Sequence, residues 1–226
     1  MADYKLIKIE NSELKLMETE EGLTLTDGKL QLRGDFRSML PRIRPGALQR
    51  ELLVKAAKFK KADHPLKAVD ATAGLGEDSF LLAAAGYDVT LFEQDQVIAL
   101  LLEDALLRAR KDPDLSECAT RMHLIKTDSI EGMKHLAEKP DLIYLDPMFP
   151  ERQKSGLVKK KFQLLQKLES PCTDGEELLK AAMEAGPTRI VIKRMLKGPL
   201  LGGIKPSYSI KGKTIRFDIS TCAVSG

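Results

Sequence analysis

The sequence has little of what would mark a membrane-spanning, secreted or metal-binding protein. No run approaches the roughly 18 consecutive apolar residues that a membrane helix needs. The first residues, Met1 to Tyr4, lack the basic and then apolar design of a signal peptide, so a cytoplasmic protein is expected. Its three cysteines show no Cys-x-x-Cys spacing, which predicts reduced thiols. Its three histidines are equally scattered, so we predict no metal site.

The net charge of +3 is too small to indicate a nucleic-acid partner by itself, but its distribution is uneven. One basic cluster runs from Arg33 to Lys61 and a second from Arg152 to Lys167. Acidic residues concentrate elsewhere, at 10–21 and 112–117. Such runs are more often solvated helix faces than binding sites. Their meaning therefore depends on what lies beside them.

A repeated strand, loop and helix rhythm occupies most of the chain. Strands are expected at 66–70, 88–93, 122–126, 141–146 and 189–193, and helices at 79–85, 97–110, 130–138 and 175–185. Two more strands, 208–211 and 214–219, suggest a terminal hairpin. This alternation predicts an α/β, Rossmann-like domain over residues 46–226, with a mostly parallel seven-stranded sheet and a C-terminal antiparallel hairpin.

The first 45 residues are expected to form a separate, small extension. Short alternating stretches around Asp27-Gly28 predict a β-hairpin, and a run of arginines follows it. From 46 to 61, apolar residues recur at helical spacing and predict a helix that opens the main domain.

Acidic residues end the first four predicted strands of the main domain, or come just after them. Ligands of open parallel sheets bind beyond the carboxyl ends of the strands, so these positions point to a ligand rather than to packing. The four residues are Asp70, Glu93, Asp128 and Asp146.

The loop from Asp70 to Asp78 contains a Gly-x-Gly pattern, Gly74 to Gly76, that superficially resembles a dinucleotide-binding turn. A diphosphate would bind at the start of the following helix, where Glu77 and Asp78 would repel it. The third glycine of that fingerprint is replaced by Ser79. The pattern therefore disfavours a nicotinamide cofactor.

S-adenosylmethionine fits the same loop better, because it has no phosphate and carries cationic ammonium and sulfonium groups. Glu93 comes about 20 residues after Gly74, where a carboxylate can accept both ribose hydroxyls. Asp128-Ser129, after the third strand, is placed to contact the adenine edge of this cofactor. The acids that open the helix could alternatively act only as helix caps. The cofactor-binding candidates are Asp70, Gly74, Gly76, Glu77, Asp78, Glu93, Gln94, Asp128, Ser129 and Asp146.

The fourth strand ends in Asp146-Pro147-Met148-Phe149-Pro150, a variant of the Asp/Asn-Pro-Pro-Tyr/Phe motif of methyltransferases that act on base amino groups. An exocyclic amine is a poor nucleophile because its lone pair is delocalised into the ring. A carboxylate can accept its N–H bonds and align the nitrogen for in-line displacement. We predict catalytic roles for Asp146, Pro147 as a rigid support, and Phe149 as a stacking surface for an unpaired base. A turn whose aromatic residue merely packs is the structural alternative.

The second basic cluster directly follows this motif, which favours RNA phosphates as its partner. Arginines of the first cluster could supply the other wall of the groove. The candidate RNA contacts are Arg42, Arg44, Arg50, Lys154, Lys159, Lys160 and Lys161.

Residues 69–78, 144–150, 154–160 and 213–219 together resemble the bacterial ribosomal RNA small subunit methyltransferase J family. The similarity extends over about residues 35 to 220. It implies an S-adenosylmethionine-dependent enzyme that methylates guanine N2 in 16S rRNA, at position 1516, in the small ribosomal subunit. By the same resemblance, cofactor contacts fall on Glu77-Asp78, Glu93-Gln94, Asp128-Ser129 and Asp146. The sequence departs from the family pattern at Glu77 and Gln94.

Three other functions stay open at this point. An adenine-N6 or cytosine-N4 methyltransferase would use the same motif, because it recognises an amino group rather than one base. A non-catalytic RNA-binding assembly factor could share the scaffold. A nicotinamide-dependent oxidoreductase is the third, and the acidic loop disfavours it.

Overall fold

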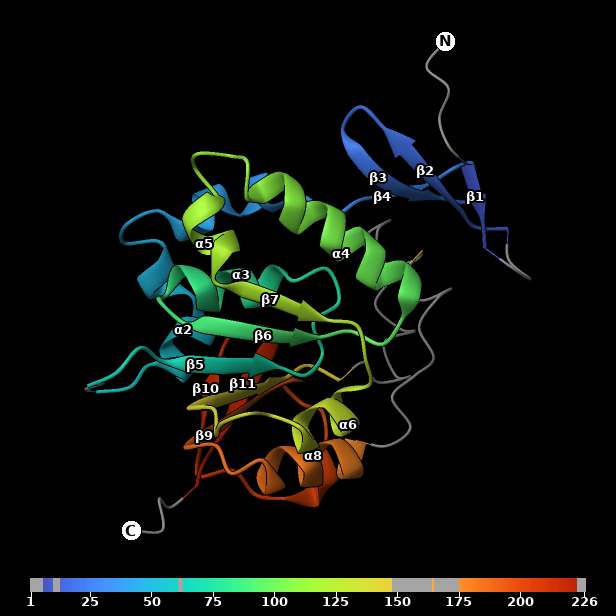
Figure 1. Ribbon diagram of the computed structural model, residues 1–226. Coiled ribbons are helices and arrows are strands. Elements are labelled where there is room, and N and C mark those ends of the chain that lie inside the picture. The colour runs from blue at the N-terminus through green and yellow to red at the C-terminus, as the bar shows by residue number, and fades with distance from the viewer. Residues whose placement is uncertain (1–5, 10–12, 61–62, 148–163, 165–174, 223–226) are drawn as a thin grey trace.

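The computed structural model describes residues 6–9, 13–60, 63–147, 164 and 175–222 (Figure 1). A seven-stranded sheet forms their centre, in the order β10-β11-β9-β8-β5-β6-β7. Its strands are β5 (Lys67–Asp70), β6 (Asp88–Phe92), β7 (Met122–Ile125), β8 (Leu142–Leu145), β9 (Arg189–Met195), β10 (Tyr208–Lys211) and β11 (Ile215–Thr221). Neighbours among β5 to β9 are parallel, whereas β11 is antiparallel to both β9 and β10. The predicted sheet and its terminal hairpin are confirmed.

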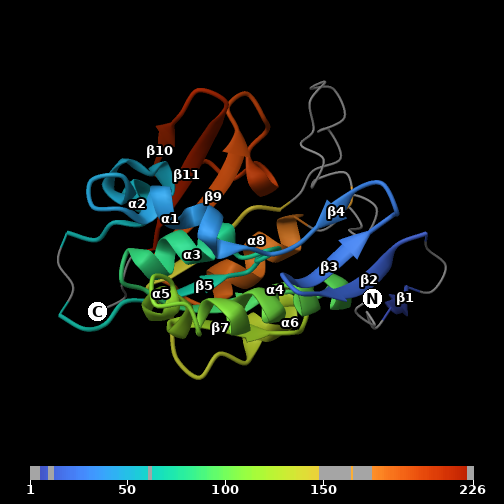
Figure 2. The same cartoon turned by 90° about the horizontal axis from the view of Figure 1, so that it is seen from above.

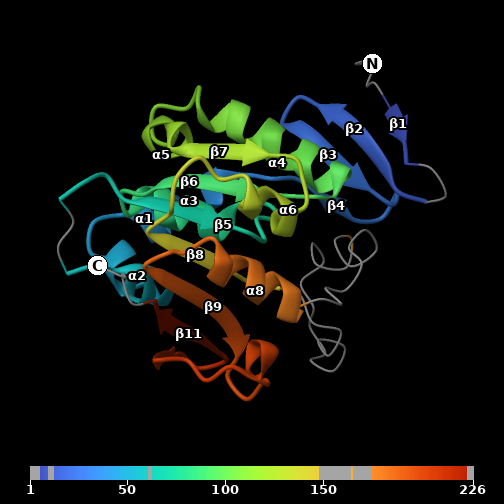
Figure 3. The same ribbon diagram turned by 60° about the horizontal axis from the view of Figure 1, so that its bottom comes forward.

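Alternate residues of each central strand enter two different hydrophobic cores, because successive side chains of a strand point to opposite faces. In β8, Leu142 and Tyr144 join one core, and Ile143 and Leu145 join the other. Such continuous apolar runs are typical of parallel strands covered on both sides. Figures 1 and 3 show the two helical layers on either side of the sheet.

Of the helices in these layers, α3, α4 and α8 begin and end close to the predicted positions, α6 ends earlier than predicted, and α5 was not predicted. The layer of the first core contains α2 (Leu52–Ala57), α3 (Glu77–Ala84), α4 (Gln96–Ala109) and α5 (Ser116–Thr120). The other layer contains α6 (Ser129–Lys134) and α8 (Gly175–Glu184). Asp95 caps α4 by accepting the backbone N–H groups of Val97 and Ile98. No helix in the described ranges is long and apolar enough to cross a membrane.

The N-terminal stretch forms a larger sheet than the predicted hairpin. The hairpin at Asp27-Gly28 is confirmed as an antiparallel pair, and two further strands extend it into a four-stranded sheet. The strands are β1 (Leu6–Lys8), β2 (Lys15–Thr19), β3 (Gly22–Thr26) and β4 (Gln31–Leu32). This sheet lies against α4 (Figure 2), where Leu25 shares a core with Ile98 and Leu101. The same core includes Leu75 of the predicted cofactor loop and the buried Leu164.

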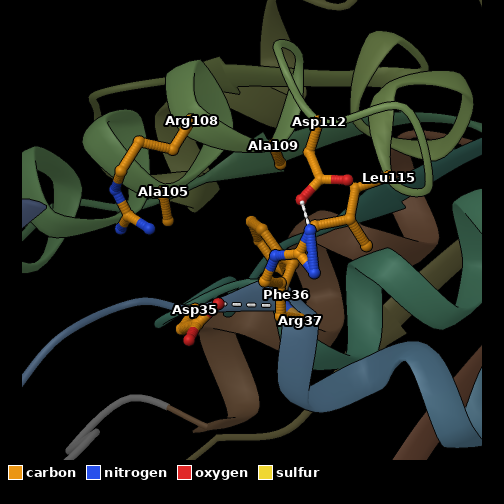
Figure 4. A pocket seen from close by; sticks show the side chains of 8 residues that line it. All are labelled: Asp35, Phe36, Arg37, Ala105, Arg108, Ala109, Asp112 and Leu115. Atoms are coloured by element: carbon orange, nitrogen blue, oxygen red, sulfur yellow. Dashed lines mark hydrogen bonds and ion pairs between the residues drawn. The ribbon is translucent and has the colours of Figure 1, made fainter. Parts of the chain in front are cut away.

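Two short helices follow the small sheet, η1 (Phe36–Met39) and α1 (Leu40–Ile43). Phe36 stacks on Phe80 of α3, with ring centroids 4.7 Å apart, so this part of the extension packs into the main core. A shallow pocket lies between η1 and the C-terminal half of α4 (Figure 4). Its Arg37 pairs with Asp112 at 2.7 Å, which ties the N-terminal stretch to the main domain.

The helix predicted over residues 46–61 is wrong in its extent. The structure has a 3-10 turn, η2 (Leu48–Arg50), and then the short α2. Glu51 separates them with an extended backbone at ψ 128°, and Lys58 ends α2 in the same way at ψ 123°. Glu51 uses its carboxylate to pair with Arg42, a tertiary contact that outweighs helical spacing here.

Candidate active site at the carboxyl edge of the sheet

The loop between β5 and α3 is fastened to its neighbours by backbone hydrogen bonds. Ala71 donates to the carbonyl of Tyr144 on β8 at 3.1 Å, and Ala73 donates to that of Phe92 on β6 at 3.2 Å. Gly76 adopts a left-handed conformation, φ 76°, directly before the first residue of α3. A Cβ atom there would lie 2.8 Å from Leu102 Cδ1, so both backbone and packing require glycine. Gly74 also has positive φ, 53°, but a Cβ there would meet nothing within 4 Å.

Asp70 supports this loop from beneath. Its side chain is buried, with only 1% of the residue exposed, and accepts hydrogen bonds from Thr72 N–H at 3.0 Å and Ser79 Oγ at 2.5 Å. Burial raises the pKa of Asp70 to about 7, although both hydrogen bonds act in the opposite direction. In this structure its carboxyl group is therefore occupied by the loop itself.

Glu93 follows β6 and joins the end of that strand to the glycine loop. One carboxylate oxygen accepts the N–H of Gly74 at 2.9 Å, and the other accepts that of Asp95 at 2.8 Å. Burial raises the pKa of Glu93, against the lowering effect of these backbone hydrogen bonds. A carboxylate offers about four acceptor positions, so the backbone donors of Gly74, Gln94 and Asp95 do not saturate it. The neighbouring Gln94 is exposed.

Lys193 joins two carboxylates that the sequence places far apart. Its Nζ atom lies 2.7 Å from Asp78 Oδ2, in the first turn of α3, and 2.9 Å from Asp146 Oδ2, after β8. The hydroxyl of Tyr144 also donates to Asp78, at 2.6 Å. All of these side chains except that of the buried Tyr144 keep about a fifth of their surface exposed, so the cluster lines the carboxyl edge.

Charge pairing decides the protonation of this cluster. Burial alone would raise the pKa of Asp78, but Lys193 and the hydrogen bonds hold it below its usual value. Burial would likewise lower the pKa of Lys193, and the two carboxylates raise it instead. Both groups are therefore charged at neutral pH.

Asp146 and the glycine loop are also linked through the backbone. The N–H of Asp146 donates to Thr72 Oγ1 at 2.7 Å, and Pro147 is buried behind it. The start of the predicted catalytic motif is thus held against the predicted cofactor loop. Phe149 and the predicted RNA contacts Lys154, Lys159, Lys160 and Lys161 lie outside the described residues.

The remaining predicted cofactor residues lie at the end of the neighbouring strand β7. Asp128 is exposed and caps α6 by accepting the N–H of Glu131 at 3.0 Å; Ser129 is the first residue of that helix. Because β6 and β7 are parallel neighbours, these residues share an edge with Glu93. Within the described ranges, no group of three or more His, Cys, Asp or Glu side chains is arranged to hold a metal ion.

The three predicted arginines differ in their engagement. Arg42 forms a bidentate salt bridge with Glu51, in which Nε and Nη2 each lie 2.8 Å from a carboxylate oxygen. This hydrogen bonding raises the pKa of Arg42, and Asp78 and Glu77 are near enough to contribute. Arg44 and Arg50 are exposed to solvent.

Lys193 is the residue of this site that the sequence reasoning missed. The signal that identified the acids also applies to Lys193, because a charged residue near the carboxyl end of a buried parallel strand is hard to explain by packing. The first four predicted strands end on or beside acids, and the fifth, 189–193, ends on Lys193, so the same signal selects this residue.

The strand order, together with the loop after β5 and the acid after β6, defines a Rossmann-like methyltransferase fold of class I. A SAM-dependent methyltransferase from Neisseria gonorrhoeae superposes with a TM-score of 0.74 at 33% identity, over 93% of this chain and 84% of that one. Residues 1–222 match the family described as "Putative SAM-dependent methyltransferase".

Two curated relatives make the family assignment more specific. The ribosomal RNA small subunit methyltransferase J of Thioalkalivibrio sulfidiphilus is 45% identical over 175 residues, covering 76% of this chain and 68% of the relative. That of Stutzerimonas stutzeri is 40% identical over 219 residues, covering 94% and 84%. The chain belongs to this S-adenosylmethionine-dependent methyltransferase family, as its motifs predicted. The predicted cofactor is thereby confirmed.

The site fits that cofactor on its own geometry. The Glu93 carboxylate at the end of β6 can accept a hydrogen bond from a hydroxyl, and the space over Gly74 leaves room for a ligand beside the loop. The cluster of Asp78, Asp146 and Lys193 brings two carboxylates to the edge beside the loop, where a cationic ligand can approach them.

Proposed function

We propose that this protein methylates the exocyclic N2 amine of a guanine in 16S rRNA of the small ribosomal subunit. The observation that carries the proposal is the position of Asp146, an acid at the end of β8 held by Lys193 and Thr72 beside the cofactor loop. The names of the relatives support small-subunit rRNA as the substrate. The choice of guanine N2 rests on the resemblance of the sequence to that family. We place the reaction in the cytoplasm, where such rRNA is made.

We assign the cofactor-holding roles as follows. Glu93 accepts the ribose hydroxyls, while Asp128 and Ser129 contact the adenine edge with Gln94 beside them. Gly74 and Gly76 permit close approach of the backbone, and Glu77 and Asp78 face the cationic end. Asp70 supports the loop from below rather than touching the ligand. When bound, S-adenosylmethionine supplies an electrophilic methyl group.

Asp146 is the proposed acceptor for the N–H groups of the target amine. A lysine ammonium 2.9 Å away holds this carboxylate in place, and its oxygens can accept hydrogen bonds from an amine. Such a fixed acceptor suits orientation of the amine. Pro147 restricts the backbone of the motif, and Phe149 is proposed to stack on the flipped base. Alignment then provides much of the rate acceleration.

Exposed basic residues near this edge are proposed to hold the RNA backbone. Arg44 and Arg50 are free to contact phosphates, whereas Arg42 contributes charge while it holds Glu51. Lys154, Lys159, Lys160 and Lys161 are proposed as the contacts from the other side, on the basis of the sequence alone. Such contacts position the substrate without reading its bases.

Deletion of the gene tests the proposal in the cell. We expect mass spectrometry of 16S rRNA nucleosides to show one N2-methylguanine fewer, restored by the wild-type protein and not by Asp146→Ala. An unchanged N2-methylguanine content would reject guanine N2 as the target. If an N6-methyladenine or an N4-methylcytosine disappears instead, the same motif serves a different base.

A further inference from the structure

We infer that two turns at the C-terminal side of the sheet form an additional RNA-binding wall, with Lys197, Lys211 and Lys213 as its phosphate contacts. The inference rests on the proposed function, since it names where the substrate strand runs beyond the target base. We call these two turns, residues 195–199 and 211–214, the basic turns. Their lysines belong to neither of the basic clusters that the sequence singled out.

The basic turns lie together at the active-site edge. The N–H of Leu196 donates to the carbonyl of Thr214 at 2.9 Å, and Ile215 pairs with Met195 in the sheet. Met195 is the last residue of β9, which runs parallel to β8. The basic turns therefore share an edge with Asp146, which follows β8.

A buried ion pair fixes the first basic turn. Arg216 Nε lies 2.9 Å from Asp218 Oδ1, and both residues are buried. Arg216 Nη1 donates to the carbonyls of Met195, Leu196 and Gly198 at 2.8 to 2.9 Å. A turn held by so many bonds presents its lysine without a large loss of backbone entropy on binding.

The second basic turn brings the N-terminal arginines alongside. Gly212 lies so close to Leu52 that a Cβ atom there would be 2.7 Å from Leu52 Cδ1. Arg50 precedes Leu52 by two residues and is exposed. The wall thus joins residues from three separate parts of the chain.

The charge of this surface, among the described residues, is positive. Lys197, Lys211, Lys213 and Arg50 are exposed, and none forms an ion pair with another described residue. The nearby acids are already paired: Glu51 with Arg42, Asp218 with Arg216, and Asp146 with Lys193. A cationic surface of this kind is complementary to a polyanionic backbone such as that of RNA.

Charge-removing substitutions test the inference, with a control of equal charge change. Lys197→Gln, Lys211→Gln and Lys213→Gln are combined in one variant. The control combines Lys58→Gln, Lys60→Gln and Lys111→Gln, three exposed lysines at the opposite side. Lys58 lies there because its carbonyl accepts from Arg189, at the amino end of β9. The probe is an unmodified 16S rRNA transcript. Its Kd for each variant is measured by fluorescence anisotropy at salt concentrations from roughly 50 to 300 mM.

We expect the basic-turn variant to bind the transcript on the order of 10- to 100-fold more weakly near physiological salt, with a salt slope reduced by about two to three. Its affinity for S-adenosylhomocysteine should stay at the wild-type value. A wild-type Kd and salt slope in this variant, or an equal loss in the control, would overturn the inference. If the variant binds RNA more weakly as predicted but the wild-type protein transfers no methyl group to rRNA, the RNA-binding surface stands and the proposed reaction is rejected.

Discussion

Lys193 and Asp146 form an ion pair of 2.9 Å at the carboxyl edge of the sheet, and the same ammonium group reaches Asp78 at 2.7 Å. One lysine thus connects the end of β8, where the amine is proposed to bind, with the first turn of α3, where the cofactor loop ends. We therefore propose that Lys193 positions both ligands, because a shift of its side chain would move two carboxylates.

Replacing Lys193 with Met should lower kcat for methyl transfer by about 100-fold, because Asp146 loses the charge that orients it. Lys193→Arg retains a cation and should recover part of the rate. Steady-state kinetics with rRNA substrate measures both variants. A wild-type kcat in Lys193→Met would exclude the positioning role.

The same variant should change the pH dependence of stability. In the wild type the pKa of Asp78 is lowered, so its stabilising effect is present above its unfolded pKa and is lost as pH falls through the folded pKa. Without Lys193 the strongest of the lowering influences is lost, so the pKa of Asp78 rises and less of this stability is present at neutral pH. We expect the Tm deficit of Lys193→Met to be largest at neutral pH and to shrink towards pH 5. A deficit that is constant with pH would contradict this account.

Asp70 should oppose folding at neutral pH and favour it in acid. Its folded pKa of about 7 is above the value in an unfolded chain. Its stabilising contribution to the folded state is therefore fully present below about pH 4 and is lost as pH rises towards 7. Asp70→Asn keeps hydrogen-bonding capacity without the charge and should flatten this part of the Tm profile. Asp70→Ala leaves the partners of its carboxyl group unpaired and should cost about 1–3 kcal/mol. If Asp70→Asn keeps the wild-type pH profile, another group causes it.

Glu93→Ala should weaken binding of S-adenosylhomocysteine by about 10- to 150-fold, the range for loss of hydrogen bonds to a charged group. Isothermal titration calorimetry measures this affinity directly. The matched control is Glu103→Gln, which removes a carboxylate charge from an exposed position on α4, where it pairs with Lys126. An affinity for Glu93→Ala equal to that of the control would remove Glu93 from the cofactor site.

The two glycines of the loop should respond differently to alanine. Both have positive φ, which costs an alanine roughly 1–2 kcal/mol. Gly76→Ala also clashes with Leu102, so its Tm should fall further than that of Gly74→Ala. Gly74→Ala has no protein atom in the way, and its larger effect should be on S-adenosylhomocysteine affinity. Equal Tm values for the two variants would contradict the packing argument.

The order of strands and helices could be predicted because each element carries a local signal, a buried apolar run or a helical repeat. The acids at the strand ends could be predicted for the same reason, since a parallel sheet gathers its carboxyl ends at one edge. The N-terminal sheet was only partly predictable. Its hairpin at Asp27-Gly28 carried a turn signal, whereas the outer strand β1 has three residues, too few for alternation to show.

The directions of side chains and the pairing of residues far apart in the chain could not be predicted from the sequence. Asp70 ends one buried strand and Asp146 follows another, yet Asp70 turns inward to Ser79 while Asp146 meets Lys193. The contact of Lys193 with Asp78 joins residues 115 positions apart, and no spacing rule indicates it. The bend at Glu51 likewise depends on its tertiary partner Arg42.

The most direct test of the central claim is methyl transfer in vitro from labelled S-adenosylmethionine to unmodified 30S particles and to 16S rRNA, followed by nucleoside mapping. The account predicts label in a single N2-methylguanine, with Asp146→Ala inactive while still binding the rRNA. Label in another nucleoside, or full transfer by Asp146→Ala, would contradict it.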